Sequence, residues 1–453
     1  MLHLRAALHP AQILAISFVG VIFVGTLLLR LPLAATGAPI TWIDALFTAT
    51  SATCVTGLTV VDTGTRFSLF GQTVILVLIQ TGGLGFMTFS TTFALLMGKK
   101  LSRKERTLVQ DAFTPFPAQD LRVLVRHILG VTFLIEGVGA LVLFVRWFED
   151  YPPLQAAYYA IFHAISAFCN AGFALFFDSF IRYRTDWVLN LAITGLIILG
   201  GLGFLPLMEI RNLLTWNSHY KKRLSLHTKV VLSVTALLLG LGTLVLFLLE
   251  GRNTLRGLSL PDKILVSYFQ AVTPRTAGFN TIDYSFATNS TLFFTTILMF
   301  IGASPGSTGG GVKTSTFGIL LAMVKTWFQG QERVHLFNRT LPREVIAKAL
   351  SVIVVAAAII FFFTTILLMT ELRAVSYIHS RGQFLELFFE VVSAFGTVGL
   401  SIGATPKLTF AGKLLIILLM FIGRLGPLTL AIALAHKEAK GKFQYPEENV
   451  MIG

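Results

Sequence analysis

The chain has 453 residues, of which 54% are hydrophobic and only 13% charged, with a net charge of +14 and a mean hydropathy of +0.76. A soluble domain carries about 25% charged residues, so this composition excludes an ordinary soluble fold and predicts an all-α integral membrane protein. The two cysteines exclude a disulfide framework.

The first apolar run, AQILAISFVGVIFVGTLLL, begins at residue 11. No small-residue cleavage site of the signal-peptide type follows it, so we expect a retained membrane span. Apolar runs of similar length recur to the end of the chain, and their relation to four short glycine-containing stretches decides the expected architecture.

The chain contains four copies of a stretch that aligns on a glycine. The copies are SATCVTGL, SAFCNAGF, TPRTAGF and SAFGTVGL, and their glycines are Gly57, Gly172, Gly278 and Gly399. A phenylalanine followed by a polar residue precedes each glycine, by ten residues in three copies and by nine in the third. Self-similarity of this kind is the signature of a repeat architecture.

Each glycine lies between two long apolar runs. The preceding runs cover residues 11–30, 126–148, 228–249 and 346–370, and the following runs cover 71–97, 187–210, 290–328 and 411–435. The following runs share a motif, seen in IQTGGLGFM, ILGGLGFLP, FIGASPGSTGGG and FIGRLGPLT. The sequence therefore predicts four repeats, at 1–98, 99–215, 216–330 and 331–436, and a short cytoplasmic tail at 437–453.

Each repeat is predicted to be a span, a short pore helix, a glycine turn and a second span. Two spans per repeat give all four copies the same orientation, with the symmetry axis along the membrane normal. The pore helices have about ten to thirteen residues, too few to cross roughly 30 Å of hydrocarbon. Because irregular backbone at that depth must be buried in protein or line water, we expect eight transmembrane helices and four re-entrant pore loops with pseudo-fourfold symmetry around one pore.

The basic charge is distributed unevenly over this topology. The connections between repeats and the two termini hold 21 basic and 9 acidic residues, whereas the connections within repeats hold 12 of each. Cytoplasmic loops carry the excess of Lys and Arg, so both termini are expected in the cytoplasm and the glycine turns open to the outside. The positive charge is then a topology signal, and no nucleic-acid partner is expected.

The four aligned glycines favour a cation filter. A cation that leaves water needs oxygens in place of its hydration shell, and backbone carbonyls supply them where the chain turns them toward the axis. Glycine adopts the positive φ that such turns often need, and the C-terminal ends of four pore helices add negative potential. One glycine alone would be explained by tight packing, but four at equivalent places favour the filter.

Several polar side chains lie near the predicted filter. Glu136, inside the first span of the second repeat, is expected to make a hydrogen bond between helices rather than an ion site. Cys54 and Cys169 each lie three residues before a filter glycine, and we expect small apolar packing rather than a redox switch.

Further polar residues share one pore-helix position or lie at the filter's edge. Arg275 precedes the third filter stretch, and we expect a rim arginine anchored by an acidic neighbour such as Asp283 or Glu390. The shared pore-helix position is expected to tie the back of the filter to neighbouring helices rather than to contact the ion; its residues are Thr48, His163, Gln270 and Glu390.

The stretch ASPGSTGGGVKTS at 303–315 has some features of a phosphate-binding loop. That motif needs a lysine directly after its second glycine, but Val312 follows Gly311 here, and a membrane-type apolar run precedes the stretch in place of a strand. We therefore do not expect this chain to bind a nucleotide. Proline and clustered glycines interrupt a helix, and a broken helix about one span below Gly278 is expected to line the pore and act as a gate.

Arg424 interrupts the apolar run LLIILLMFIGRLGPL in the corresponding part of the fourth repeat. An arginine inside a span is costly, so it faces water, a counter-ion or carbonyl groups. Three alternatives remain open: the arginine repels cations below the filter, holds the predicted gate by hydrogen bonds, or belongs to a structural salt bridge.

The motifs together resemble one family. SATCVTGL, CNAGF, PRTAGFNT, SAFGTVGLS and GASPGSTGGGVKT closely resemble the KtrB proteins of the Trk/Ktr/HKT superfamily, the potassium-translocating subunits of bacterial Ktr systems, over essentially the whole chain. Only ten residues precede the first span, which favours Ktr over Trk relatives with two extra spans. Gly57 stands where some sodium-passing plant relatives have serine, which favours potassium.

The resemblance implies the residues of the site. The potassium filter would consist of Val55, Thr56, Gly57, Asn170, Ala171, Gly172, Thr276, Ala277, Gly278, Thr397, Val398 and Gly399, whose carbonyls hold the ion. The gate would consist of Gly306, Ser307, Thr308, Gly309, Gly310, Gly311, Lys313 and Thr314, with Arg424 below the filter. Because only glycine is common to the four stretches, we expect a less stringent filter that also passes sodium at high concentration.

The resemblance also implies partners and a location. We expect a homodimer in a bacterial cytoplasmic membrane, in contact with lipid and with a cytoplasmic KtrA-type ring that binds nucleotides. The basic connections at 99–106 and 221–229 are candidate docking surfaces. Sodium-dependent activity is expected from the family, although no residue identifies a sodium site.

The sequence fits other classes of function less well than it fits a pore. No metal-ligand spacing or nucleophile motif favours an enzyme. A cation-coupled secondary transporter is the stronger alternative, since repeats and broken helices occur there too. A sodium-translocating or Trk-type relative is the other alternative, and single-channel currents would separate a pore from a carrier.

Overall fold

The computed structural model describes residues 10–85, 121–214, 224–373 and 375–426. The predicted tail at 437–453, the docking candidate at 99–106 and parts of several apolar runs lie outside the described residues. The protein is an all-α membrane protein, apart from one short hairpin among the described residues.

Each repeat contributes three kinds of helix in the same order. The first spans are α1 (Pro10–Arg30), α7 (Leu121–Trp147), α11 (Leu226–Glu250) and α15 (Arg343–Glu371). The pore helices are α2 (Trp42–Thr53), α8 (Pro153–Phe168), α12 (Leu260–Val272) and α16 (Gln383–Gly396). The helices of the following runs are α4 (Leu69–Leu84), α9 (Trp187–Leu202) with α10 (Phe204–Leu214), α13 (Asn289–Phe300) with α14 (Thr314–Phe328), and α17 (Phe410–Leu425).

Smaller elements connect these helices. A short helix, α3 (Thr63–Arg66), precedes α4, and the hairpin of β1 (His335–Leu336) and β2 (Arg339–Thr340) joins α14 to α15. The hairpin is antiparallel, with His335 opposite Thr340, and Phe337 and Asn338 turn the chain with positive φ, as two-residue hairpin turns require. Short 3-10 turns lie at Pro32–Ala34, Ile181–Tyr183, Tyr284–Phe286 and Thr405–Lys407.

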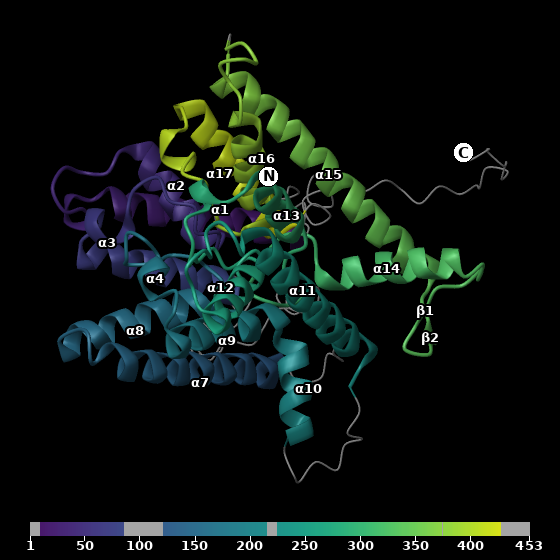
Figure 1. The fold of residues 1–453 in the computed structure, drawn as a ribbon. Helices are drawn as coiled ribbons and strands as arrows, with labels where there is room; N and C mark the ends of the chain where they lie inside the picture. Colours follow the sequence, from purple (N-terminus) through teal and green to yellow (C-terminus); the bar gives the residue numbers. More distant parts are fainter. Residues whose placement is uncertain (1–9, 86–120, 215–223, 374, 427–453) are drawn as a thin grey trace, which may run out of the picture.

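The repeats pack as a closed ring. α4 packs against α8, α9 against α12, α13 against α16, and α17 against α2, so the second helix of every repeat contacts the pore helix of the next. Figure 1 shows α7 along one edge of the molecule and α15 along another, with the shorter helices grouped between them. The last contact returns to the first repeat, which places all four pore helices around one centre.

The second runs are not continuous helices in the described residues, and the break expected in the third repeat is present. Glycines with positive φ end three of the helices, at Gly85, Gly203 and Gly426. In the second repeat the chain bends by 104° between α9 and α10. In the third, residues 301–313 separate α13 from α14. The shared glycine motif therefore marks a break in the helix, because glycine tolerates the left-handed backbone that stops it.

The helices of the second runs are shorter in the described residues than most of the first spans. Among the described residues, three helices are long and apolar enough to cross a membrane: Val125–Trp147, Leu226–Glu250 and Arg343–Glu371. α4 and α17 have 16 residues each in the described part of the chain, or about 24 Å at 1.5 Å per residue.

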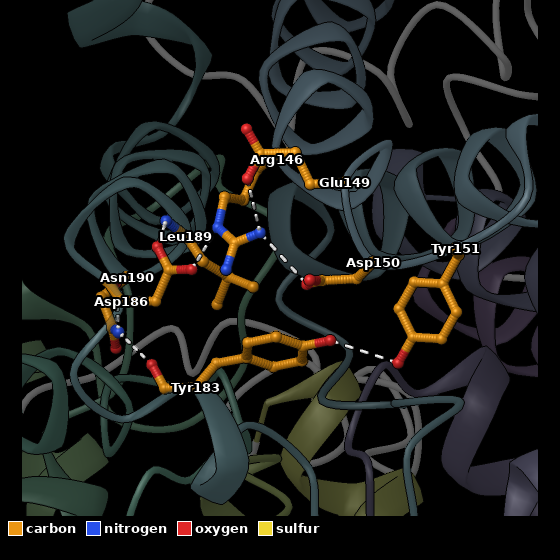
Figure 2. A network of polar contacts seen from close by, with 8 residues as sticks. All are labelled: Arg146, Glu149, Asp150, Tyr151, Tyr183, Asp186, Leu189 and Asn190. Atoms are coloured by element: carbon orange, nitrogen blue, oxygen red, sulfur yellow. Dashed lines mark hydrogen bonds and ion pairs between the residues drawn. The ribbon is translucent and has the colours of Figure 1, made fainter.

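Polar networks fasten the spans at the ends that precede the pore helices. In the second repeat, Arg146 at the end of α7 bonds Asp186, the N-cap of α9, at 2.5 Å and Asp150 at 3.1 Å, and the hydroxyls of Tyr151 and Tyr183 lie 3.2 Å apart (Figure 2). A span end and the start of the next helix are thus locked together on the side where the pore helix enters.

In the third repeat, Glu250 joins the end of α11 to the start of α13. Its carboxylate is 2% exposed and accepts hydrogen bonds from the backbone N–H of Thr288 at 2.9 Å and the hydroxyl of Thr291 at 2.6 Å, at the start of α13. It also accepts from the hydroxyl of Thr254 at 2.8 Å and the amide of Asn253 at 2.8 Å. One side chain therefore satisfies donors from two segments.

Glu250→Ala is expected to lower the free energy of unfolding by about 1–3 kcal/mol, because buried donors at the start of α13 lose their acceptor. The measurement is the denaturation midpoint of the detergent-solubilised protein. Glu149→Ala is the matched control, since the Glu149 side chain is 78% exposed and lies 3.7 Å from Arg146. Equal destabilisation by the two substitutions would contradict the assignment.

Candidate functional site

The four aligned glycines form equivalent turns at the ends of the pore helices. Their φ angles are +92° at Gly57, +70° at Gly172, +77° at Gly278 and +90° at Gly399. The residue two positions earlier is also left-handed in every repeat, with φ of 56° at Val55, 59° at Asn170, 71° at Thr276 and 50° at Thr397. Non-glycine residues rarely adopt this conformation, so its recurrence in all four repeats shows that the turn is a shared structural feature rather than a chance irregularity.

The turns meet at the centre of the ring. A Cβ atom on Gly57 would lie 2.5 Å from the carbonyl oxygen of Ala171 and 3.0 Å from the Cα of Gly172. The same relation links Gly172 to the Ala277 carbonyl at 2.8 Å, Gly278 to the Val398 carbonyl at 2.6 Å, and Gly399 to the Thr56 carbonyl at 2.1 Å. Each glycine thus adjoins a carbonyl of the next repeat, and the fourth relation closes the circle.

In each repeat, a hydroxyl near the end of the pore helix holds the filter strand, the three residues that end at the glycine. Ser51 accepts a hydrogen bond from the N–H of Gly57, and Ser393 accepts one from Gly399, both at 3.1 Å. In the other repeats the hydroxyl donates to the carbonyl just after the glycine: Ser166 to Phe173 at 2.8 Å and Thr273 to Phe279 at 2.5 Å. Sequence reasoning missed these four residues, although each is the first residue of its aligned stretch.

The shared pore-helix position ties the outer arm of the filter in three repeats. Leu175 donates its N–H to Nε2 of His163 at 3.1 Å, the amide of Gln270 lies 2.9 Å from the hydroxyl of Thr281, and Thr405 donates to Glu390 at 2.7 Å. Ser401 also donates to Glu390. These partners belong to the segment that follows the filter in the same repeat, so the prediction of ties to neighbouring helices is wrong for these three residues. It is also wrong for Thr48, whose buried hydroxyl has no partner in the described part of the chain.

A cavity of about 160 Å³ opens above the ring. All four filter glycines line it, together with Asp62. The remaining polar lining includes Thr59, Thr63, Ser179, Asn280, Tyr284 and Ser401. The mouth of the ring is therefore polar, as the entry to a cation path requires.

The segment 303–315 lies directly below the ring as a compact loop. Its ends are pinned side by side, because Gly302 donates its N–H to the carbonyl of Val312 at 2.8 Å. Ser304 and Thr314 hydroxyls lie 2.9 Å apart, and Ser307 donates to the Ser304 carbonyl at 2.6 Å. We refer to residues 303–315 as the gate loop, after the role expected for them from the sequence.

The gate loop contacts two filter strands and the end of one pore helix. Gly310 donates its N–H to the hydroxyl of Thr397 at 3.1 Å, and Thr308 donates to the carbonyl of Phe168 at 3.2 Å. A Cβ atom on Gly309 would lie 2.1 Å from the hydroxyl oxygen of Thr276. Glycine is thus required at 309 by close approach.

Two cationic side chains hold the gate loop. Lys313 donates to the carbonyl of Gly309 at 2.7 Å and lies 3.3 Å from that of Gly310. Arg424 donates to the carbonyls of Thr308 and Gly82, and so ties the loop to the first repeat. Three alternatives were open for Arg424. A structural salt bridge is wrong, because no carboxylate lies within ion-pair distance among the described residues. The two hydrogen bonds support the alternative in which Arg424 holds the loop.

The prediction for Arg275 is wrong. Its guanidinium is 6% exposed and donates to the hydroxyl of Thr235 on α11 at 3.1 Å, with no acidic partner within ion-pair distance in the described residues. The two candidate anchors are occupied elsewhere: Asp283 accepts from Ser285 at 2.6 Å, and Glu390 accepts from Thr405. The side chain therefore points behind the filter rather than to its rim.

Glu136 behaves as predicted, whereas Cys169 is not packed among apolar groups alone: its thiol lies 3.5 Å from Oε1 of Gln80 and 3.9 Å from Oε1 of Glu136. Gln80 on α4 donates its amide to Glu136 on α7 at 3.2 Å, which is a hydrogen bond between helices of neighbouring repeats. Cys54 and Cys169 are both free and buried. A Cβ atom on Gly83 would lie 2.6 Å from the sulfur of Cys169, so this thiol fills the space beside α4.

Sequence comparison assigns the chain to a family. The profile of the TrkH family, described as cation transport proteins, matches residues 3–444. The chain is 45% identical to the Ktr system potassium uptake protein B of Bacillus subtilis, over 98% of this chain and 97% of that protein. It is 40% identical to the potassium/sodium uptake protein NtpJ of Enterococcus hirae, over 99% of this chain and 98% of that protein.

A solved structure has the same fold. The potassium transporter TrkH from Vibrio parahaemolyticus superimposes with a TM-score of 0.74 and 19% sequence identity, over 96% of this chain and 87% of that one. The predicted resemblance to KtrB proteins of the Trk/Ktr/HKT superfamily is confirmed. The family consists of transport proteins rather than enzymes. The chain therefore belongs to the TrkH family of cation transport proteins.

Proposed function

We propose that this protein carries potassium into the cell through a pore lined by the four glycine turns. The filter strands are Val55–Gly57, Asn170–Gly172, Thr276–Gly278 and Thr397–Gly399. One observation carries the proposal: each filter glycine adjoins a carbonyl of the next repeat, and this relation closes after four steps. Converging peptide oxygens replace the hydration shell of an alkali cation, and the pore-helix dipoles favour positive over negative charge.

Potassium is the favoured ion for two reasons. The relative from B. subtilis is named a potassium uptake protein, and this chain has glycine at all four filter positions. The relative from E. hirae is named a potassium/sodium uptake protein, and the residues before the four glycines differ between repeats. We therefore expect potassium to be preferred and sodium to pass at high concentration.

The gate loop is proposed to close the inner end of this pore. Contacts with Thr397, Phe168 and Arg424 hold it across the axis. The charge distribution in the sequence puts this loop on the cytoplasmic side of the filter, so that ions entering from outside meet the filter first.

Arg424→Gln is expected to raise the resting potassium flux about tenfold, because two charge-assisted hydrogen bonds to the Thr308 and Gly82 carbonyls are weakened. The flux is measured as rubidium entry into proteoliposomes. Lys325→Gln is the control, since Lys325 lies in the last turn of α14 away from the loop. An unchanged flux in Arg424→Gln would contradict its role in closure.

The partners and the location are also proposals. The Ktr system to which the B. subtilis relative belongs by name implies a second subunit. We propose a homodimer in a bacterial cytoplasmic membrane, with both termini in the cytoplasm and a KtrA-type ring that binds nucleotides. Gating by that ring and dependence on sodium belong to the same proposal. Co-purification with a KtrA-type subunit tests the assembly.

The filter proposal is tested by ion competition in proteoliposomes. Rubidium entry is measured against rising potassium or sodium outside, and single-channel currents are recorded in planar bilayers. We expect potassium to compete at lower concentration than sodium, and discrete currents to appear. Exclusion of rubidium with free passage of sodium would overturn potassium as the substrate, and slow saturable turnover without discrete currents would favour a carrier.

A further inference from the structure

The residue two positions before each filter glycine differs between repeats, although its backbone conformation is the same. It is Val55, Asn170, Thr276 and Thr397, all left-handed. Potassium coordination by backbone carbonyls makes no demand on these side chains. Their differences follow instead the segment that lies beneath each of them.

Two of these side chains face the gate loop, and their contacts are polar or very close. The hydroxyl of Thr397 accepts the N–H of Gly310 at 3.1 Å. The hydroxyl of Thr276 adjoins Gly309 and lies 3.2 Å from the amide of Asn170. A layer of polar side chains thus joins the inner end of the filter to the gate loop.

The other two side chains have different neighbours. In the second repeat a Cβ atom on Gly201 of α9 would lie 3.2 Å from the side-chain nitrogen of Asn170. In the first repeat a Cβ atom on Gly82 would lie 3.0 Å from Cγ2 of Val55, so Val55 packs against the end of α4. The position is occupied by valine where the neighbour is α4, and by Thr397 where the neighbour is the backbone N–H of Gly310 in the gate loop. Because valine holds the same left-handed turn in the first repeat, the hydroxyl of Thr397 is not needed to fold the turn.

Resting on the proposed filter and gate, we propose that the Thr397 hydroxyl couples the gate loop to the filter, so that ion occupancy of the filter and closure of the loop depend on each other. Thr397 is the C-cap of α16 in a strained conformation, and its backbone belongs to the filter strand. Strained residues persist where their surroundings hold them, and one of the groups holding Thr397 is the loop itself. Thr397 is thus a positioning residue for gating.

The test compares Thr397→Val with and without the gate loop. In the intact protein, Thr397→Val is expected to raise resting rubidium flux about fivefold, the effect of losing one hydrogen bond of ordinary net strength. In a variant lacking residues 306–311, the same substitution is expected to change nothing, because the partner is gone. Thr397→Ser keeps a hydroxyl and is expected to behave as wild type.

Thr364→Val is the matched control, since the Thr364 hydroxyl on α15 is buried without a partner among the described residues; its flux should equal that of wild type. An equal effect of Thr397→Val with and without the loop, or no effect in either, overturns the coupling alone. If the loop deletion itself leaves the flux unchanged, the gate and the coupling are both overturned.

A second measurement reads the position of the loop rather than the flux. The half-buried Ser307 is replaced in Ser307→Cys, and labelling of the introduced thiol is timed in potassium and in choline; the native Cys54 and Cys169 are buried. We expect at least a twofold difference between the two salts, and we expect Thr397→Val to abolish it. A difference that persists in Thr397→Val, or one that is absent with Thr397 present, overturns the coupling.

Discussion

Deletion of residues 306–311 is expected to raise resting potassium flux more than tenfold. The deleted segment includes the N–H of Gly310 bonded to Thr397, the hydroxyl of Thr308 bonded to Phe168, and the carbonyl bonded by Arg424. Each hydrogen bond contributes about 1 kcal/mol net, and about 1.4 kcal/mol corresponds to a factor of ten in an equilibrium. Loss of three such contacts together with the physical block favours the open path by at least that factor.

Rubidium entry into proteoliposomes measures this effect, with N-methylglucamine as an ion too large for the filter. We expect rubidium entry to rise and N-methylglucamine to stay excluded, because the filter turns lie outside the deletion. The matched control replaces Phe337 and Asn338 by Asn-Gly, which suits the two-residue turn of the β1–β2 hairpin. Flux that is unchanged by the deletion, or entry of N-methylglucamine, would contradict a gate at this place.

The convergence of the four glycine turns could be predicted from the sequence because the same stretch occurs in all four repeats. One glycine such as Gly57 has many explanations, but four at equivalent places require a common cause, and symmetry then brings them to one axis. The closed ring of glycine and carbonyl neighbours agrees with that expectation. The four supporting hydroxyls could have been found in the same way, since Ser51, Ser166 and Ser393 open their aligned stretches.

The helix ends at Gly85, Gly203 and Gly426 could not be predicted from hydropathy. Apolar composition continues through Gly85, Gly203 and Gly426, and a hydropathy profile does not distinguish a straight helix from one bent by 104°. The shared glycine motif was visible, but glycine is also common in unbroken transmembrane helices. Backbone conformation, rather than composition, decides between the two.

The orientation of Arg275 could not be predicted for a different reason. Sequence proximity suggested an ion pair with Asp283 or Glu390, but both carboxylates have nearer hydroxyl donors. The left-handed turn at Thr276 directs the chain so that Arg275 points to Thr235 on α11. Competition for acceptors in a folded site depends on three-dimensional neighbours, which spacing along the chain does not reveal.

Gly57→Ser is expected to lower the preference for potassium over sodium by ten- to a hundredfold. The φ of +92° at this position is costly for any residue with a side chain, and a Cβ atom would lie 2.5 Å from the Ala171 carbonyl oxygen. Strain of this kind costs about 1–3 kcal/mol, and about 1.4 kcal/mol is a factor of ten. The carbonyl must move away, and the ring then no longer matches one ion.

The measurement is potassium-dependent growth of a transport-deficient bacterium, together with the ratio of potassium to sodium competing with rubidium entry. Gly240→Ala on α11 is the control, because open space surrounds that position and alanine suits a helix better than glycine by about 1 kcal/mol. Its growth and its selectivity should equal those of wild type.

Serine substitutions at the other three filter glycines separate a filter from mere tight packing. The distance from a Cβ atom to the neighbouring carbonyl oxygen is 2.1 Å at Gly399, 2.5 Å at Gly57, 2.6 Å at Gly278 and 2.8 Å at Gly172. If the carbonyls hold the ion, the loss of selectivity should follow this order, with Gly399→Ser the most severe. If the glycines only allow helices and turns to pack, all four variants would fold less well while the transport that remains keeps the wild-type ratio of potassium to sodium.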